Sequence, residues 1–178
     1  MRALKREFAG VDLHDPSRVG SESRIFGETP VLTVVKLLGV VEEGGPRQLL
    51  DLGSGRGTVV LAAAACGFTG LGLELEADWV ARAQRVAKRL DLPAEFRCAD
   101  FLEEDWPAAA VVFVVATAFP EEVRAEILER VRRLQPGSYL IAGDWPGLHS
   151  LDLVWQGPLP VDWGVIPFSV YRIGEHMP

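Results

Sequence analysis

The feature that most constrains the fold is an alternation of short apolar segments and longer amphipathic segments along the middle of the chain. We predict parallel strands at the apolar segments, which are residues 48–52, 69–75, 94–98, 111–115 and 138–142. Between these strands we predict helices over residues 58–66, which are rich in alanine, 78–90, which carry apolar residues on one face, and 121–134, which begin with acids and end with arginines. A chain that alternates in this way folds as a doubly wound α/β sheet.

A further helix is expected ahead of the first strand. Apolar residues recur at helical spacing from Val31 to Val41. Thr29 is of a type that caps a helix, and Pro30 suits the first helical position.

After residue 142 the alternation stops. Residues 151–157 and 165–173 both resemble strands and are joined through Pro158, Pro160 and Trp163, with no helical segment between them. An antiparallel pair at one edge of the sheet explains this pattern. We find no internal repeat and no linker, so we expect residues 1–178 to form one domain.

The composition limits the kind of partner. The net charge is -7, which argues against nucleic acid, because phosphate binding requires basic surface. It suits small molecules or basic protein segments. The apolar run 108–116 is too short for a membrane span of about 18 residues, and the first residues are polar, so we expect a soluble, cytoplasmic protein.

Two minor features complete the composition. Cys66 and Cys98 are expected to be small buried hydrophobes, and no Cys/His cluster has metal-ligand spacing, so no metal is expected. The chain has no asparagine and few lysines, which is typical either of heat adaptation or of a GC-rich genome.

The stretch "LLDLGSGRGTVV" places Gly53, Gly55 and Gly57 between the first strand and its helix. Ligands of open α/β sheets bind beyond the carboxyl ends of the strands. Glycine there lets the backbone adopt positive φ and approach a ligand closely, and the helix amino end attracts negative charge. The pattern predicts a ligand-binding turn, although some turns of this kind are purely structural.

Acidic residues at the ends of successive strands specify the ligand further. Glu74 ends the second strand, where a carboxylate can accept both hydroxyls of a ribose. Asp100 and Phe101 follow the third strand and can meet the amino group and the face of an adenine. Asp51 would repel a pyrophosphate but attract an ammonium group, so the set favours S-adenosylmethionine over a dinucleotide.

The segments "LLDLGSGRGTVV", "GLGLELEADWV" and "RCADFLEEDW" resemble the successive motifs of class I S-adenosylmethionine-dependent methyltransferases. With "FGETP" and "VVFVVATAFPEEV", the chain is also similar to the non-SET histone-lysine methyltransferases of the disruptor-of-telomeric-silencing type. The glycine segment and the closing "VYRIGE" resemble small lysine methyltransferases of archaea and mitochondria. The resemblance and the alternation together predict a Rossmann-like, seven-stranded sheet in the order 3-2-1-4-5-7-6, with strand 7 antiparallel.

The resemblance implies where the cofactor S-adenosyl-L-methionine binds. An N-terminal arm, residues 1–28, would lie over the site. The residues that it implies to be cofactor-binding are Glu28, Thr29, Asp51, Gly53, Ser54, Gly55, Glu74, Leu75, Asp100 and Phe101. Glu28, Thr29, Asp51, Gly53 and Gly55 would surround the methionine part, Glu74 the ribose, and Asp100 with Phe101 the adenine.

The resemblance also implies a protein lysine as the methyl acceptor. Val115, Phe119 and Trp145 follow or end strands and are expected to line the acceptor channel, and His149 is a possible general base. The telomeric-silencing type has paired asparagines where this chain has Val115 and Ala116, so the channel is less polar here. An RNA or small-molecule methyltransferase and a non-catalytic binding module remain as alternatives, although the Asn/Asp-Pro-Pro-Tyr motif typical of base-amino methyltransferases is missing.

Overall fold

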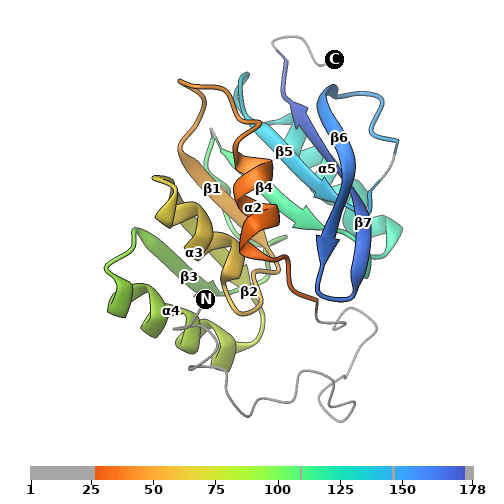
Figure 1. The fold of residues 1–178 in the computed structure, drawn as a ribbon. Helices are drawn as coiled ribbons and strands as arrows, with labels where there is room; N and C mark the ends of the chain where they lie inside the picture. Colours follow the sequence, from red (N-terminus) through yellow and green to blue (C-terminus); the bar gives the residue numbers. More distant parts are fainter. Residues whose placement is uncertain (1–26, 109, 146, 175–178) are drawn as a thin grey trace.

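The computed structural model describes residues 27–108, 110–145 and 147–174, so the expected arm up to residue 26, His14 and His176 lie outside the described residues. The elements in chain order are α2 (Val31–Leu38), β1 (Gln48–Leu52), α3 (Thr58–Ala65), β2 (Thr69–Glu74), α4 (Ala77–Leu90), β3 (Ala94–Cys98), β4 (Val111–Val115), α5 (Glu121–Arg132), β5 (Tyr139–Gly143), β6 (Asp152–Val161) and β7 (Gly164–Arg172) (Figure 1).

The strands form one sheet in the order β3-β2-β1-β4-β5-β7-β6, which confirms the predicted topology. The first five strands are parallel, and β7 runs antiparallel to both of its neighbours. The order reverses between β1 and β4, at the switch point where open α/β sheets bind ligands.

The two faces of the sheet are covered differently. Helices α2, α3 and α4 pack over one face, on a core that includes Val34, Val60 and Val86. Of the described helices only α5 packs over the other face, through Ile127 and Val131. The connections β3–β4 and β5–β6 contain no helix among their described residues (Figure 1). Loop side chains such as Leu148 complete this second core.

The β6–β7 hairpin is longer than predicted. Pro158 and Pro160 lie inside β6 rather than in the turn, which consists of Asp162 and Trp163. Proline has no N–H to donate, so these residues hinder pairing of the exposed edge strand with another chain. Because β5 ends opposite Phe168, the hairpin extends past the carboxyl ends of the central strands (Figure 1).

The start of α2 also differs from the prediction. The helix begins at Val31 with Pro30 in the N-cap position, and no side chain caps it, so the prediction of Thr29 as the cap was wrong. Thr29 is buried. The helix is anchored instead by the Thr33 hydroxyl, which donates to the carbonyl oxygen of Pro160 in β6 at 2.8 Å.

Both cysteines are exposed, contrary to the prediction that they are buried. Cys66 follows the last turn of α3, and Cys98 ends β3, which forms the other edge of the sheet. An edge strand has only one neighbour to cover it, and of β3 only Phe96 is buried.

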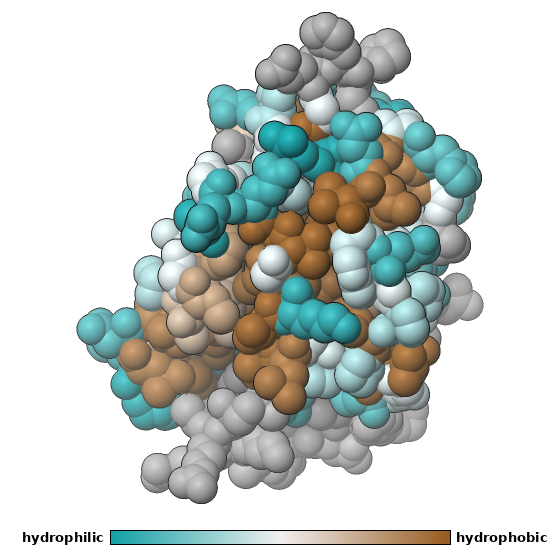
Figure 2. Space-filling model, turned by 45° about the horizontal axis from the view of Figure 1, so that its top comes forward, coloured by the Kyte–Doolittle hydropathy of each residue, from teal (hydrophilic) through white to brown (hydrophobic). Residues whose placement is uncertain are grey.

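Figure 2 shows the α2 side of the molecule, tilted so that the amino ends of the parallel strands come forward, and the surface in this view is mixed. Apolar side chains gather in the middle of this view, and hydrophilic ones border them. The exposed apolar side chains of α2 are Leu32 and Val35. None of the helices in the described part of the chain is long and apolar enough to cross a bilayer.

Candidate methyl-donor site

The turn between β1 and α3 is built by its own backbone. Gly53, Gly55 and Gly57 all have positive φ, at 76°, 52° and 82°. The N–H groups of Gly53 and Ser54 both donate to the carbonyl oxygen of Leu73, at 3.0 and 2.9 Å. We call residues 53–57 the glycine loop; these bonds hold it over the end of β2.

The glycines of this loop face different surroundings. A Cβ at Gly57 would lie 2.6 Å from the ring of Phe96, so that position has no room for a side chain. A Cβ at Gly53 would meet only Phe119 Cζ, at 3.7 Å. The loop is therefore packed against the protein at Gly57 and open toward a ligand at Gly53, which is exposed.

Ser54 has a different orientation from the one that its predicted role suggests. Its hydroxyl is buried, has no hydrogen-bond partner among the described residues, and lies against Gly72 beneath the loop. Only the backbone of Ser54 is therefore placed to face a ligand.

The Glu74 carboxylate joins the glycine loop to the end of β2. Its Oε2 accepts the N–H of Gly55 at 2.8 Å, and its Oε1 accepts the N–H groups of Leu75 and Glu76 at 2.8 and 3.0 Å. A carboxylate offers about four acceptor positions. A ribose that donates two hydroxyls must therefore displace one of these backbone bonds.

Asp51 lies at the carboxyl end of β1 and is only 4% exposed. Burial, and secondarily the charge of Glu74, raise the pKa of Asp51 from 3.8 to about 8. A buried carboxyl group of this kind is neutral at pH 7 unless a cation lies beside it. The site is therefore suited to a ligand that brings a positive charge.

Asp100 and Phe101 lie together after β3. Asp100 Oδ1 accepts the N–H of Leu102 at 2.8 Å, and the side chain is exposed. The Phe101 ring is half-buried and lies 5.5 Å from the ring of Phe119, which comes from the β4–α5 connection. We call residues 99–106 the adenine loop, after the ligand part that the sequence analysis predicts there; the two rings place it against the neighbouring connection.

Glu28 is engaged by the glycine loop and does not point freely into a cleft. It accepts a hydrogen bond from the Thr58 hydroxyl and pairs with Arg56 at 3.2 Å. Its backbone N–H donates to Asp162 Oδ1 at 2.9 Å, in the turn of the β6–β7 hairpin. Arg56, which the sequence analysis did not single out, thus connects the segment before α2 to the glycine loop.

The predicted channel residues have unequal exposure. Val115 and Phe119 are half-buried at the carboxyl end of β4 and in the loop that follows it. Trp145 is only 7% exposed and packs in the core on the α5 side of the sheet. His149 is exposed in the β5–β6 connection.

The structure adds Asp144 to the residues at the carboxyl ends of the parallel strands, which we call the carboxyl edge of the sheet. It directly follows β5, opposite the end of β4, and has a φ of 52°, which is unusual for a residue other than glycine. Its N–H donates to the carbonyl oxygen of Pro167 at 2.8 Å, which joins β5 to the hairpin. The sequence signal was available, since aspartate tolerates this conformation at the end of a strand.

Comparison with known proteins identifies the family. Residues 49–137, which run from β1 to the turn that precedes β5, match the model of the methyltransferase domain. The chain belongs to the methyltransferase-domain family. No curated protein matches the sequence.

Solved structures agree with this assignment. An RNA methyltransferase from Salinibacter ruber in complex with S-adenosyl-L-homocysteine is 27% identical, with a TM-score of 0.66, over 84% of this chain and 95% of that one. The magnesium protoporphyrin IX methyltransferase of Synechocystis with bound S-adenosylmethionine is 16% identical, with a TM-score of 0.66, over 97% and 90%. The N-methyltransferase NodS from Bradyrhizobium japonicum is 16% identical, with a TM-score of 0.62, over 80% and 94%, so these last two show the fold.

The protein is a class I S-adenosylmethionine-dependent methyltransferase. The side chains at the carboxyl edge are of chemical types that suit this donor. Asp51 is a buried acid, Gly53 leaves open space, and the carboxylates of Glu74 and Asp100 can accept hydrogen bonds from hydroxyl and amino groups. When bound, the donor supplies a methyl group on a positively charged sulfur.

Proposed function

We propose that this methyltransferase transfers the methyl group to the side-chain amine of a lysine in a protein partner. The donor would lie along the carboxyl edge of the sheet, with its ammonium group at Asp51. Glu74 and Leu75 would hold the ribose, and Asp100 with Phe101 the adenine. Glu28 and Thr29 would close the methionine end, where Glu28 already contacts the glycine loop.

The observation that carries the proposal is the acidity of this edge. Acidic side chains end the strands, open α4 and α5 and occupy the hairpin turn, namely Glu28, Asp51, Glu74, Glu76, Asp78, Asp100, Glu121, Glu122, Asp144 and Asp162. Two arginines at this edge are engaged: Arg56 pairs with Glu28, and Arg124 donates to the carbonyl oxygens of Ala116 and Phe119. Such an edge attracts a cationic substrate and repels phosphate.

Asp144 and Val115 support an amine acceptor in complementary ways. The half-buried Asp144 carboxylate would receive the approaching ammonium group at the mouth of the site. Val115 and Phe119, with the exposed part of Trp145, would form the apolar channel in which a neutral amine is favoured over a charged one. The ammonium proton leaves to solvent before the transfer.

The transfer is an in-line displacement. The lysine nitrogen forms a bond to the methyl carbon while the carbon–sulfur bond breaks and its electron pair stays on sulfur. Holding donor and acceptor in line and excluding water can lower the barrier by about 7–11 kcal/mol. The protein therefore needs a positioned channel rather than a nucleophilic side chain.

RNA is a second candidate acceptor. The observation that favours it is the RNA methyltransferase of Salinibacter ruber, which is 27% identical over 84% of this chain. The acidic edge opposes it, since an RNA-binding surface neutralises phosphates with basic side chains.

The test is to incubate the purified protein with donor labelled in the methyl group and a cell lysate. We expect label in protein, on lysine by mass spectrometry, and Asp144→Asn should lower the labelling while donor affinity is kept. Glu122→Gln removes a charge of the same edge from the first turn of α5 and serves as a matched control. Label only in RNA or in small molecules contradicts the lysine proposal.

A further inference from the structure

The adenine loop carries two proposed donor-binding residues without support from a regular element. No helix or strand is formed by the described residues between β3 and β4. The N–H groups of Leu102, Glu103 and Glu104 donate to Asp100 and shape a turn. The N–H of Ala99 donates to the carbonyl oxygen of Glu74 in β2 at 3.0 Å, so the loop is bonded to the sheet at its first residue, ahead of Asp100 and Phe101. The rest of the loop is held by contacts with other elements.

Arg130 in α5 supplies the attachment. Its guanidinium donates to the carbonyl oxygen of Leu102, to that of Glu104 at 3.0 Å and to that of Phe101 at 3.5 Å. These partners lie 26 to 29 residues away in the sequence. A planar guanidinium with five donors can serve several carbonyl groups at once, which an ammonium group cannot do in the same geometry.

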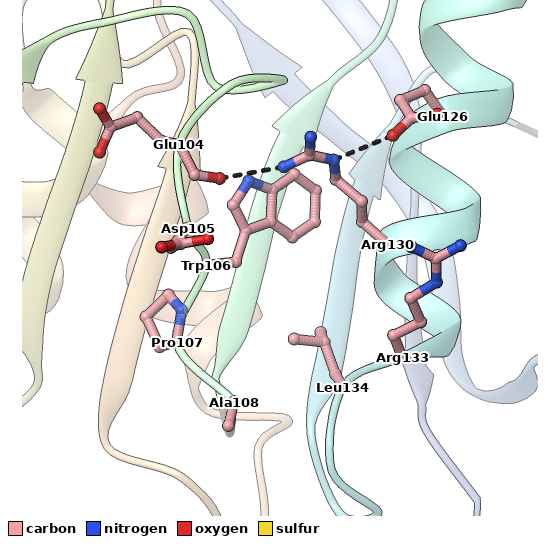
Figure 3. Close-up of a pocket in the computed structure, with 9 residues that line it drawn as sticks. All are labelled: Glu104, Asp105, Trp106, Pro107, Ala108, Glu126, Arg130, Arg133 and Leu134. Carbon is pink, nitrogen blue, oxygen red and sulfur yellow. Dashed lines mark hydrogen bonds and ion pairs between the residues drawn. The ribbon is translucent and has the colours of Figure 1, made fainter.

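The guanidinium is itself oriented from both sides, as Figure 3 shows. Glu126, one turn earlier in α5, accepts from Arg130 Nε at 3.1 Å. The guanidinium carbon lies 5.6 Å from the centre of the Trp106 ring, and the Trp106 indole N–H donates to the carbonyl oxygen of Phe101 at 2.8 Å. Trp106 and Arg130 thus act on the same carbonyl group, and they line a groove of about 330 Å³ between the loop and α5.

Arg133 lines the same groove, so two arginines of one helix can be compared. Its side chain is 72% exposed and pairs with Glu129, whereas the Arg130 side chain is 25% exposed and contacts three loop carbonyl groups. The two arginines share residue type, helix and groove but differ in contact with the loop.

We infer that Arg130 is a positioning residue for the methyl donor: it holds the adenine loop so that Asp100 and Phe101 meet the adenine, and thereby sets the selectivity for that base. In this role Arg130 does not contact the donor itself. The inference rests on the proposed placement of the adenine, which the experiment tests separately.

The experiment compares the binding of S-adenosylhomocysteine with that of S-inosylhomocysteine, in which an oxygen replaces the adenine amino group, by calorimetry. The wild type should prefer the adenosyl compound, because Asp100 accepts from the amino group and repels the oxygen. Arg130→Met should weaken binding of the adenosyl compound about tenfold, the equivalent of about 1.4 kcal/mol, and the inosyl compound much less. Arg130→Lys should lie between the two, and Arg133→Met should match the wild type.

The affinities of Arg130→Met test the positioning role, and those of Asp100→Asn test the placement of the adenine. Unchanged affinities in Arg130→Met, or an equal loss for both compounds, overturns the positioning role, since a general loss of structure cannot change the ratio of the two affinities. Thermal unfolding of each variant measures such a loss. If Arg130→Met does not fold, the two affinities are compared in Arg130→Lys instead. Asp100→Asn should erase or reverse the preference, because its amide can donate to the inosine oxygen. If it does not, the proposed adenine placement is wrong, and the role of Arg130 falls with it.

Discussion

The glycine loop and the adenine loop lie at neighbouring strand ends but are held by different means. Main-chain bonds to Leu73 and the lack of space beside Gly57 determine the glycine loop. Side chains of another helix determine the adenine loop, chiefly Arg130. The first arrangement can be inferred from a local motif, whereas the second exists only once α5 has packed on the sheet. The two loops should therefore respond differently to substitution.

The largest effect is expected at Asp51, beneath the glycine loop. Its pKa is raised from 3.8 to about 8 in the folded protein, so between these values the folded state binds the extra proton. The contribution of Asp51 to the free energy of unfolding should therefore be fully present below about pH 4 and be lost as the pH rises to about 8, by an amount on the order of 5 kcal/mol.

Urea unfolding of the protein without donor, measured across this pH range, checks the expectation. Asp51→Asn should remove most of the decline. A decline that persists in Asp51→Asn would assign it to other groups, and no decline in the wild type would show that the buried carboxyl group is charged.

The next largest effect on stability is expected at Gly57, and it should exceed the effect at Gly53 in the same loop. Gly57→Ala adds a Cβ with no room at a φ of 82°, and should destabilise by about 2–5 kcal/mol. Gly53→Ala adds one at a φ of 76° where only Phe119 is near, and should cost about 1–2 kcal/mol. Equal losses in urea unfolding would refute the distinction between a packed and an open end.

A smaller effect is expected from Glu74, and on donor affinity rather than on folding alone. Glu74→Gln loses an acceptor that the N–H of Gly55 or a ribose hydroxyl uses, and should weaken donor binding by about 1.5–3 kcal/mol. Asp78→Asn, in the first turn of α4, is the matched control. Calorimetry that finds the same affinity in both variants would remove Glu74 from the site.

Part of the fold and of the candidate site could be predicted from the sequence. The strands β1, β3 and β4 have the predicted bounds. In β4 the reason is a run of five β-branched or aromatic residues between alanines, which is typical of a buried strand. The glycine loop was also predicted, since glycines with positive φ follow a buried strand. In the hairpin, the predicted turn prolines Pro158 and Pro160 lie within β6, because an edge strand tolerates missing N–H groups.

The contributions of Arg56 and Arg130 could not be predicted with the same means. Arg130 occupies a helix position typical of a solvated basic residue, and its partners are carbonyl groups that no residue type reveals. The exposure of Cys66 and Cys98 likewise depends on which elements cover an edge. Local patterns predict elements, whereas contacts between elements require the packed structure.

The smallest effect is expected at Arg97, which also reaches the adenine loop. It pairs with Glu95 at 2.6 Å and with Glu104 at 3.3 Å, but its side chain is 45% exposed. Exposed ion pairs contribute about 0–1 kcal/mol, so Arg97→Ala should change stability and donor affinity little. A loss as large as that of Arg130→Met would mean that surface charge, not the carbonyl contacts, holds the loop.

The measurement that tests the donor site most directly is the number of protons released when S-adenosylmethionine binds. If its ammonium group lies beside Asp51, binding at pH 7 must ionise a carboxyl group whose pKa is about 8 without donor. Calorimetry in two buffers of different ionisation enthalpy should then show release of about one proton per donor bound, and almost none in Asp51→Asn. Equal heats in both buffers for the wild type would contradict a donor cation at Asp51.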